Sequence, residues 1–470
     1  MFPKVFGALL LAAVGAQIAA AGEVVAHFML DNSYAYTKSQ WKTDMAAAQQ
    51  VGIDGFALNW IPPDCNHPSR GWQLDRIDDA YDAAESMGFK LMFSFDMSYS
   101  ECNIYWNTTF MSSMITKYSG SSAAMRWNTN VLVSTYGGDQ VDEYGNDFFQ
   151  KLKDTVKGSG VAISLSPALT SYSEGAQNHA DTAASNLIKN YPSIDGFFNW
   201  QAWPLENDNL TVSADEAFKS ALNNAGKTGP YIMAISPWQF KDLNDGVAAN
   251  SWVSYSDTLF TQRLHAVANA AFSPDIIEIL TWNDFCESHY LRDIPSFTDV
   301  SATDYVTYSN GMDNYVKDMN HAPWRIIAKY YISWWKNGKA PAIAMDQVVF
   351  WYRIHPKDVV CAGGASTGSV RNYEYPVDAV FAWALVKEPS TITVSVGDNA
   401  GFTFYADGSG PQTTMVPFPD DLGNGVSPYV GIGRNGSTIH EAHGSVLITK
   451  DCAWQNFNPV VNLAGEGINR

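Results

Sequence analysis

VVAHFML (24–30), IDGFALNW (53–60) and KLMFSFDM (90–97) are apolar runs separated by longer stretches with helical periodicity. Continuous apolar strands that alternate with helices indicate a parallel sheet covered on both faces. Eight such repeats predict a (β/α)8 TIM-type barrel, an α/β fold, over residues 22–337. The same alternation continues through five further runs, namely NVLVSTY (130–136), VAISLSPAL (161–169), IDGFFNW (194–200), YIMAISPW (231–238) and DIIEILTW (275–282).

An open, doubly wound sheet is the alternative arrangement of these elements. Such sheets usually carry a glycine-rich turn after the first strand, and the sequence has none after residue 30. IDGFALNW and IDGFFNW resemble each other four strands apart, as in a barrel of duplicated halves. Two short strings are weak support for duplication, because equivalent positions demand similar residues.

The composition changes after GKAPAIAM (338–345). Residues 346–470 contain short β-rich segments separated by Gly, Pro, Asn and Ser, which predicts a C-terminal antiparallel β-sandwich. The aromatic residues mostly alternate within these strands, as core residues do. We therefore expect this domain to support the barrel, with carbohydrate binding as the alternative.

The first 21 residues have the features of a secretory signal peptide. Lys4 is followed by an apolar run that ends in the alanines 19–21. The run is too short to span a membrane and no stop-transfer pattern follows, so we expect a secreted protein with no membrane attachment after cleavage. The sequons at Asn107, Asn209 and Asn435 agree with glycosylation in the secretory pathway.

The charge of the chain restricts its partners. A formal net charge of −19 disfavours nucleic acid and anionic membranes, because both require basic patches. Aromatic residues make up 13% of the sequence, and rings at loop positions would suit sugars, since a flat ring packs on the apolar face of a pyranose. We expect a monomer that acts on a neutral polymer.

Two familiar motifs are rejected because of their context. GIGRNG (431–436) matches the dinucleotide fingerprint without a βαβ unit, and GASTG (364–368) matches a nucleophile elbow within a glycine-rich loop. His440 and His443 have no obvious cysteine or carboxylate partners in the sequence. No metal and no other cofactor is expected.

The densest group of chemically active residues follows the eighth strand. WNDFCESHY (282–290) holds two acids, an amide, a histidine and several aromatic residues. Catalytic residues of such barrels lie at the C-terminal ends of strands. Glycoside hydrolysis needs one carboxylic acid to protonate the leaving oxygen and one carboxylate to activate water or attack directly. Asp284 and Glu287, three residues apart in a turn, can face the same cleft.

WNDFCESHY resembles the WND-[YF]-x-ES-HY signature of glycoside hydrolase family 71, the fungal α-1,3-glucanases or mutanases. AHFMLDNSYAYTKSQWKTDMAAAQQVGIDGFALN (26–59), FSFDMS, STYGG, SPW and VFWYRIHPK resemble other motifs of the family, in its order. The similarity covers almost the whole mature chain. The main departure is Cys286, where many members carry Gly.

The resemblance implies an inverting endo-hydrolysis of α-1,3-glucan in fungal cell walls, with Asp284 and Glu287 as the catalytic carboxylates. Our working hypothesis makes Glu287 the general acid and Asp284 the base. His321 and Trp324 either fold over the cleft or pack at a helix start. The residues that would line the substrate subsites are Asp96, Trp200, Trp238, Trp282, Asn283, His289 and Tyr290.

Two other functions remain open. A retaining hydrolase of another glucan would hold its carboxyl groups ~5–5.5 Å apart, against ~6.5–9.5 Å in an inverting enzyme. A non-catalytic glucan-binding wall protein is disfavoured, because both acids are present. A chain leaving a strand is seldom a regular helical turn, so we expect the wider pair.

The five cysteines allow a specific prediction, because an oxidising compartment leaves one of them unpaired. Cys65 and Cys102 follow neighbouring strands at one face of the barrel, and Cys361 and Cys452 bracket the C-terminal region. Non-reducing peptide mapping should find the Cys65–Cys102 and Cys361–Cys452 disulfides and Cys286 as a thiol. A peptide that joins Cys286 to another cysteine would contradict this pairing.

Overall fold

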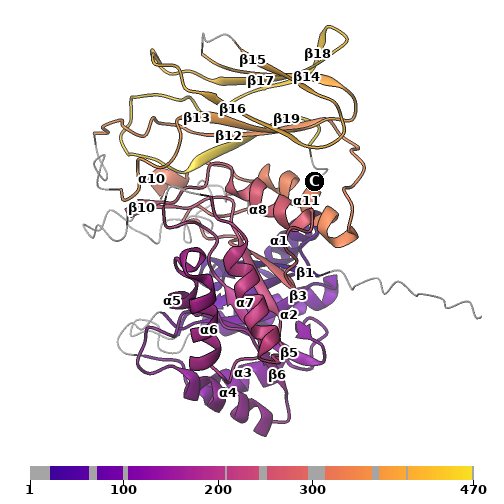
Figure 1. Ribbon diagram of the computed structural model, residues 1–470, viewed down its shortest axis with the longest axis vertical. Helices are drawn as coiled ribbons and strands as arrows, with labels where there is room; N and C mark the ends of the chain where they lie inside the picture. Colours follow the sequence, from indigo (N-terminus) through magenta and orange to yellow (C-terminus); the bar gives the residue numbers. More distant parts are fainter. Residues whose placement is uncertain are drawn as a thin grey trace, which may run out of the picture.

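Figure 1 shows the computed structural model of the chain, with the parallel strands in the lower part and the C-terminal sheets at the top. The predicted signal peptide (1–21), Cys65 and Cys102 lie outside the described residues. Asn107, Asn209 and Asn435 are all exposed, as a glycosylation site requires. The structure describes residues 22–62, 71–98, 104–206, 209–242, 251–294, 313–362, 370–397 and 401–467.

A curled parallel sheet forms the first part of the fold, and every one of its parallel strands comes from a predicted apolar run. The strand order is β6-β5-β3-β2-β1-β11-β8-β7, and the short β4 (Arg126–Trp127) pairs antiparallel with β5. Its parallel strands are β1 (Glu23–Met29), β2 (Gly55–Trp60), β3 (Lys90–Asp96), β5 (Asn130–Tyr136), β6 (Ile163–Leu165), β7 (Phe197–Asn199), β8 (Tyr231–Ile235) and β11 (Ile276–Ile279).

Backbone hydrogen bonds also connect the two ends of this strand order. Gly196 N donates to Leu165 O at 3.1 Å, and Phe198 N donates to Pro167 O at 3.0 Å. The strands are almost fully buried, because side chains of one face fill the interior and those of the other face pack under helices. The C-terminal ends of the strands therefore meet at one edge of the sheet.

Helices follow the strands in sequence and cover the sheet. Thr37 and Gln40 form a capping box at the start of the first helix, and Gly52, with φ 96°, ends it. Short elements between them are η1 (Leu30–Ser33), α5 (Thr170–Ser173), η3 (Ala176–Asn178), β9 (Phe240–Asp242), β10 (Ser251–Val253) and α10 (Asp313–Val316). The longer helices are α1 (Lys38–Val51), α2 (Gly71–Met87), α3 (Thr108–Tyr118), α4 (Asn146–Gly158), α6 (Ala180–Asn190), α7 (Ser213–Asn224), α8 (Leu259–Ala268) and α11 (Trp324–Asn337).

The C-terminal region forms two four-stranded antiparallel sheets in the described part of the chain, β16-β13-β12-β19 and β15-β14-β17-β18. The strands are β12 (Gln347–Arg353), β13 (Ala379–Leu385), β14 (Ser390–Val396), β15 (Phe402–Ala406), β16 (Gln412–Pro417), β17 (Pro428–Arg434), β18 (Ser437–His443) and β19 (Pro459–Gly465).

β12 is buried along its whole length, because both of its faces are covered. Val349 and Trp351 belong to the core that includes the parallel sheet, whereas Val348 and Phe350 belong to the core shared with the second antiparallel sheet. The first antiparallel sheet therefore lies between the helices and the second sheet, as Figure 1 shows. No helix in the described ranges is long and apolar enough to cross a bilayer.

The Cys361–Cys452 disulfide is confirmed, with a Cα–Cα distance of 5.0 Å, and Cys286 carries a thiol. His321 stacks on the Tyr290 ring with a centroid distance of 4.0 Å, and Trp324 packs against it at the start of α11. Both side chains are buried. Of the two positions left open by the sequence, they occupy the packed helix start rather than a lid over a cleft.

Candidate active site

The turn after β11 carries both predicted catalytic acids, and it is fixed to the first strand. Trp282 N donates to His27 O of β1 at 2.7 Å. The Asn283 side chain accepts from Met29 N at 2.7 Å and donates to Met29 O at 3.1 Å. Asn283 thus binds the β1 backbone much as another strand would. These bonds fix where the following residues leave the sheet.

Inside the turn, backbone amides orient the acidic side chains. Asp284 N donates to Thr281 Oγ1 at 2.8 Å, and Glu287 N donates to Asp284 Oδ1 at 3.1 Å. Ser288 has φ 59°, a left-handed conformation that reverses the chain. Phe285 points into the core. The two acids therefore face the same side of the turn.

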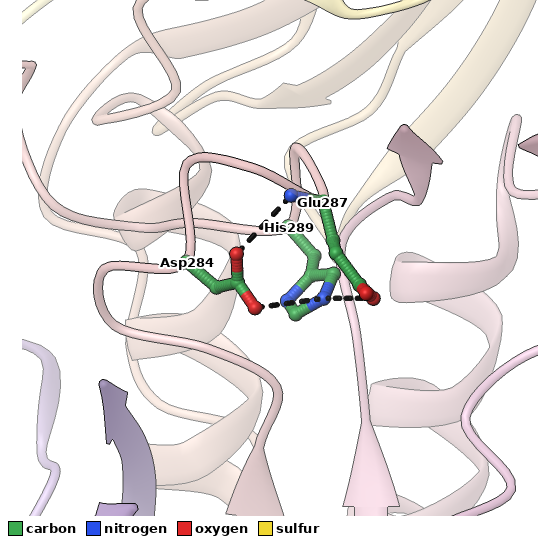
Figure 2. Close-up of side chains that lie close together, drawn as sticks. All are labelled: Asp284, Glu287 and His289. Atoms are coloured by element: carbon green, nitrogen blue, oxygen red, sulfur yellow. Dashed lines mark hydrogen bonds and ion pairs between the residues drawn. The ribbon is translucent and has the colours of Figure 1, made fainter. Parts of the chain in front are cut away.

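His289 lies between the two carboxylates (Figure 2). Its Nε2 is 3.2 Å from Glu287 Oε2 and 3.8 Å from Asp284 Oδ2. One carboxylate oxygen of each acid and the imidazole nitrogen all lie within 4.8 Å of one another. The nearest carboxylate oxygens of the two acids thus lie within 4.8 Å of each other, and the bond from the Glu287 amide to Asp284 holds the turn together.

Glu287 is held as an anion by its neighbours. Lys241 Nζ lies 3.3 Å from Oε1, and Gln239 Nε2 donates to Oε2 at 3.2 Å. Burial by itself would raise the pKa of Glu287, but the Lys241 charge and the bonds from His289 and Gln239 outweigh it, so the pKa is lowered. Its side chain is 25% exposed, which gives an incoming ligand access to it.

Asp284 has the opposite environment. Burial raises its pKa, and the nearby negative charge of Glu287 adds to that effect, while His289 opposes it. Two carboxyl groups whose pKa values are moved in opposite directions are suited to acid and base roles. The raised pKa of Asp284 and the lowered pKa of Glu287 favour Asp284 as the proton donor and Glu287 as the anion, the reverse of our working hypothesis.

A cleft of about 640 Å³ lies beside the acids. Gln239 lines it and donates to Glu287, and Trp203 lines it and packs on the His289 ring with a centroid distance of 5.3 Å. The residues that line the cleft include Ser98, Tyr136, Trp200, Trp203, Gln239, Trp252, Arg371 and Asn372.

Three predicted subsite residues lie at or under this cleft. Trp200 lines it and packs on Tyr136 with a centroid distance of 4.5 Å. Asp96 lies just beneath, where its carboxylate accepts from Ser98 N at 3.0 Å and from Ser98 Oγ at 2.7 Å. His289 lies between the acids, buried to 1% exposure.

Four other predicted subsite residues are buried and are not among the residues that line this cleft. Asn283 binds β1, and Trp282 is fully buried against Phe56. Trp238 is buried and donates from its indole N–H to Phe457 O at 3.0 Å. Tyr290 is buried and accepts from Asn458 Nδ2 at 3.1 Å. These aromatic residues near strand ends are core residues, because other parts of the fold cover them.

Several residues around the acids were not predicted from the sequence. Tyr136 ends β5, and burial together with the charges of Glu287, Asp96 and Asp284 raises its pKa, so it stays a hydrogen-bond donor. Gln239 and Lys241 lie within three residues of the end of the SPW motif. Their position after a strand of the sheet could have indicated that they belong to the site. Trp252 and Arg371 lie in segments with no such signal.

Two groups of described residues bring three possible metal ligands together. The first is Asp284, Glu287 and His289, where Lys241 already supplies a positive charge to Glu287. The second is Asp346, His440 and Glu466, so the expectation that no carboxylates accompany His440 was wrong. Arg434 pairs with Asp346 at 2.9 Å, which again supplies a positive charge at that position.

Comparison with known proteins identifies relatives over almost the whole chain. The model of glycosyl hydrolase family 71 matches residues 20–469. The glucan endo-1,3-alpha-glucosidase agn1 of Schizosaccharomyces pombe is 30% identical over 443 residues, 93% of this chain and 93% of that protein. A mutanase of Penicillium rubens is 30% identical over 458 residues, 95% of this chain and 90% of that protein.

Among solved structures, a GH99 endo-alpha-mannosidase of Bacteroides thetaiotaomicron aligns with a TM-score of 0.46 and 11% identity. The alignment covers 67% of this chain and 98% of that chain. This likeness is too distant to carry an argument.

Replacing Lys241 with Met should move the acidic limb of the pH–activity profile. A carboxylate that serves as a base or nucleophile must be ionised, and without Lys241 the burial of Glu287 is less compensated, so its pKa rises. We expect the acidic limb of kcat/KM to move to higher pH by ~1 unit or more. Lys157→Met, on the exposed face of α4, is the control that should leave the profile in place. An unmoved limb in Lys241→Met would contradict the role of Lys241.

Proposed function

Because the chain belongs to glycosyl hydrolase family 71 and is a glycoside hydrolase, we propose that it is an endo-acting α-1,3-glucanase of cell-wall glucan. The observation that carries the proposal is the Asp284–Glu287 pair at the edge of the cleft, one acid with a raised and one with a lowered pKa. The relatives' names, a glucan endo-1,3-alpha-glucosidase and a mutanase, support the same substrate.

In the proposed mechanism, Asp284 protonates the oxygen of the leaving sugar and Glu287 acts as the base. Burial keeps the Asp284 proton in place until the glycosidic oxygen accepts it. Lys241, Gln239 and His289 keep Glu287 ionised before the water proton is transferred. A neutral glucan brings no charge of its own, so this arrangement of charges is already complete in the protein.

Asp284→Asn and Glu287→Gln should each keep the fold and lose activity on α-1,3-glucan. Loss of a general acid or base costs a factor of ~10²–10⁴. Activity is measured as new reducing ends, and thermal unfolding by circular dichroism checks the fold. On an activated aryl glucoside, which needs little protonation, Asp284→Asn should recover activity and Glu287→Gln should not.

Two results would contradict this assignment. A folded variant that keeps more than about a tenth of wild-type activity would remove its acid from the mechanism. Recovery of Glu287→Gln in place of Asp284→Asn would restore the opposite assignment of roles. A wild-type protein that binds but never cleaves α-1,3-glucan would favour the non-catalytic wall protein.

For the stereochemistry we propose inversion, which the resemblance to the family implies. One observation favours retention: the nearest atoms of the two acids lie within 4.8 Å, whereas carboxyl groups of inverting enzymes are typically ~6.5–9.5 Å apart. Inversion then requires that the water lies on the exposed side of Glu287 rather than between the two acids.

Proton NMR during early hydrolysis of α-1,3-glucan should decide between inversion and retention. Inversion releases β-configured reducing ends, which should appear before mutarotation mixes the anomers. Early α-configured ends would show retention, with Glu287, the ionised acid, as the nucleophile.

The finer architecture and the location are also part of the proposal. The bonds from Gly196 and Phe198 to the β6 end of the strand order support a closed (β/α)8 barrel over residues 22–337. The core shared by the two antiparallel sheets supports a β-sandwich over 346–470. We propose secretion after removal of residues 1–21, with the protein monomeric and the sequon asparagines 107, 209 and 435 glycosylated.

A further inference from the structure

The C-terminal region contributes residues to the cleft beside the acids. Arg371 and Asn372 line the same cleft as Trp200 and Trp203. They belong to the connection between β12 and β13 of the first antiparallel sheet, more than 80 residues after Glu287 in the sequence. A region that only supported the strands from behind would place no side chain there.

Backbone bonds hold Arg371 at this position. Arg371 N donates to Ser251 O at 2.9 Å, and Val253 N donates to Arg371 O at 3.0 Å, so the segment lies alongside β10. A few residues later, Tyr375 Oη donates to Glu206 Oε2 at 3.2 Å. The connection is thus anchored at two points of the first part of the fold, β10 and Glu206.

The Arg371 side chain is exposed and is oriented by an aromatic ring. The guanidinium carbon lies 5.6 Å from the centre of the Trp252 ring, a cation–π contact. Arg371 forms no ion pair with any residue in the described ranges. Within the described residues, its N–H donors are therefore not committed to a carboxylate.

Trp252 also connects this position to the acids. Lys241 Nζ lies 5.0 Å from the centre of the same ring and 3.3 Å from Glu287 Oε1. One tryptophan thus contacts both the cation beside the catalytic pair and the arginine of the C-terminal region. Sugar bound at Arg371 would lie along the cleft from Glu287, beyond the Lys241 position.

We propose that Arg371, Asn372 and Trp252 form a glucosyl-binding subsite, through which the C-terminal region completes the substrate cleft. The inference rests on the proposed function. Arginine offers a planar fork of N–H donors and asparagine offers both donor and acceptor, a combination that matches adjacent sugar hydroxyls. A neutral glucan supplies such hydroxyls in every unit. This role goes beyond the support that the sequence predicted for the C-terminal region.

The test measures kinetics of three variants on α-1,3-linked gluco-oligosaccharides of increasing length. Arg371→Met keeps the apolar stem and removes the donors. Asn372→Gly removes the amide without strain, because Asn372 has φ 66°. For oligosaccharides long enough to reach the subsite, KM should rise about tenfold or more in Arg371→Met, the loss expected for a hydrogen bond to a charged group. The kinetics on shorter ones should not change. Lys157→Met is the control with wild-type kinetics at every length.

Product sizes give a second measurement. Loss of one subsite should change the position at which long oligosaccharides are cut, and Arg371→Lys should restore part of the wild-type pattern. A merely structural role, acting through Trp252 and Lys241 on Glu287, would instead lower kcat equally at every length and shift the pH profile.

Three outcomes would overturn the inference. The first is a folded Arg371→Met and Asn372→Gly pair with unchanged KM and products at all lengths. The second is the uniform kcat effect just described. If Arg371→Met does not fold, Asn372→Gly alone decides between these results. The third is a wild-type protein that leaves all these oligosaccharides intact, which refutes the proposed function and the subsite with it.

Discussion

The geometry of the candidate active site depends on the attachment of the turn after β11 to the backbone of β1. The Asn283 side chain both accepts from and donates to Met29, and the Trp282 amide donates to His27 O. Without these bonds the chain would leave the sheet in no fixed direction. These bonds place Asp284, Glu287 and His289 on a firmly anchored turn, as a site that positions reacting atoms requires. Buried aromatic residues such as Trp282 and Tyr290 stabilise this turn by packing in the core.

The anchored turn brings two carboxyl groups together in different electrostatic environments. Asp284 is buried and has an anionic neighbour, whereas Glu287 receives Lys241, Gln239 and His289. The turn alone would leave two similar acids. The difference in their pKa values comes from the segment that follows the neighbouring strand β8. This segment supplies Gln239, just before β9, and Lys241, within β9. The local turn therefore determines position, and the adjacent strand determines charge.

The C-terminal region is part of the same arrangement. Trp238 and Trp351 bind backbone carbonyls across the boundary, at Phe457 O and Asp257 O, so the two parts of the fold share one core. Arg371 and Asn372 extend from that region to the cleft. The composition suggested two separate domains, but residues on both sides of the predicted boundary pack in one core.

The sequence by itself determined which segments become strands, because eight continuous apolar runs leave few alternatives to a buried parallel sheet. It also determined that Asp284 and Glu287 share one turn, since only two residues lie between them. Only the tertiary structure decided how close the nearest oxygens of the acids are, in which direction each pKa is shifted, and which aromatic side chains face the cleft. These properties depend on contacts between residues distant in sequence, such as Lys241 with Glu287, Trp238 with Phe457 and Arg371 with Trp252. Hydrophobic periodicity carries no information about such contacts, because burial and local charge arise only when the strands and the C-terminal region pack together.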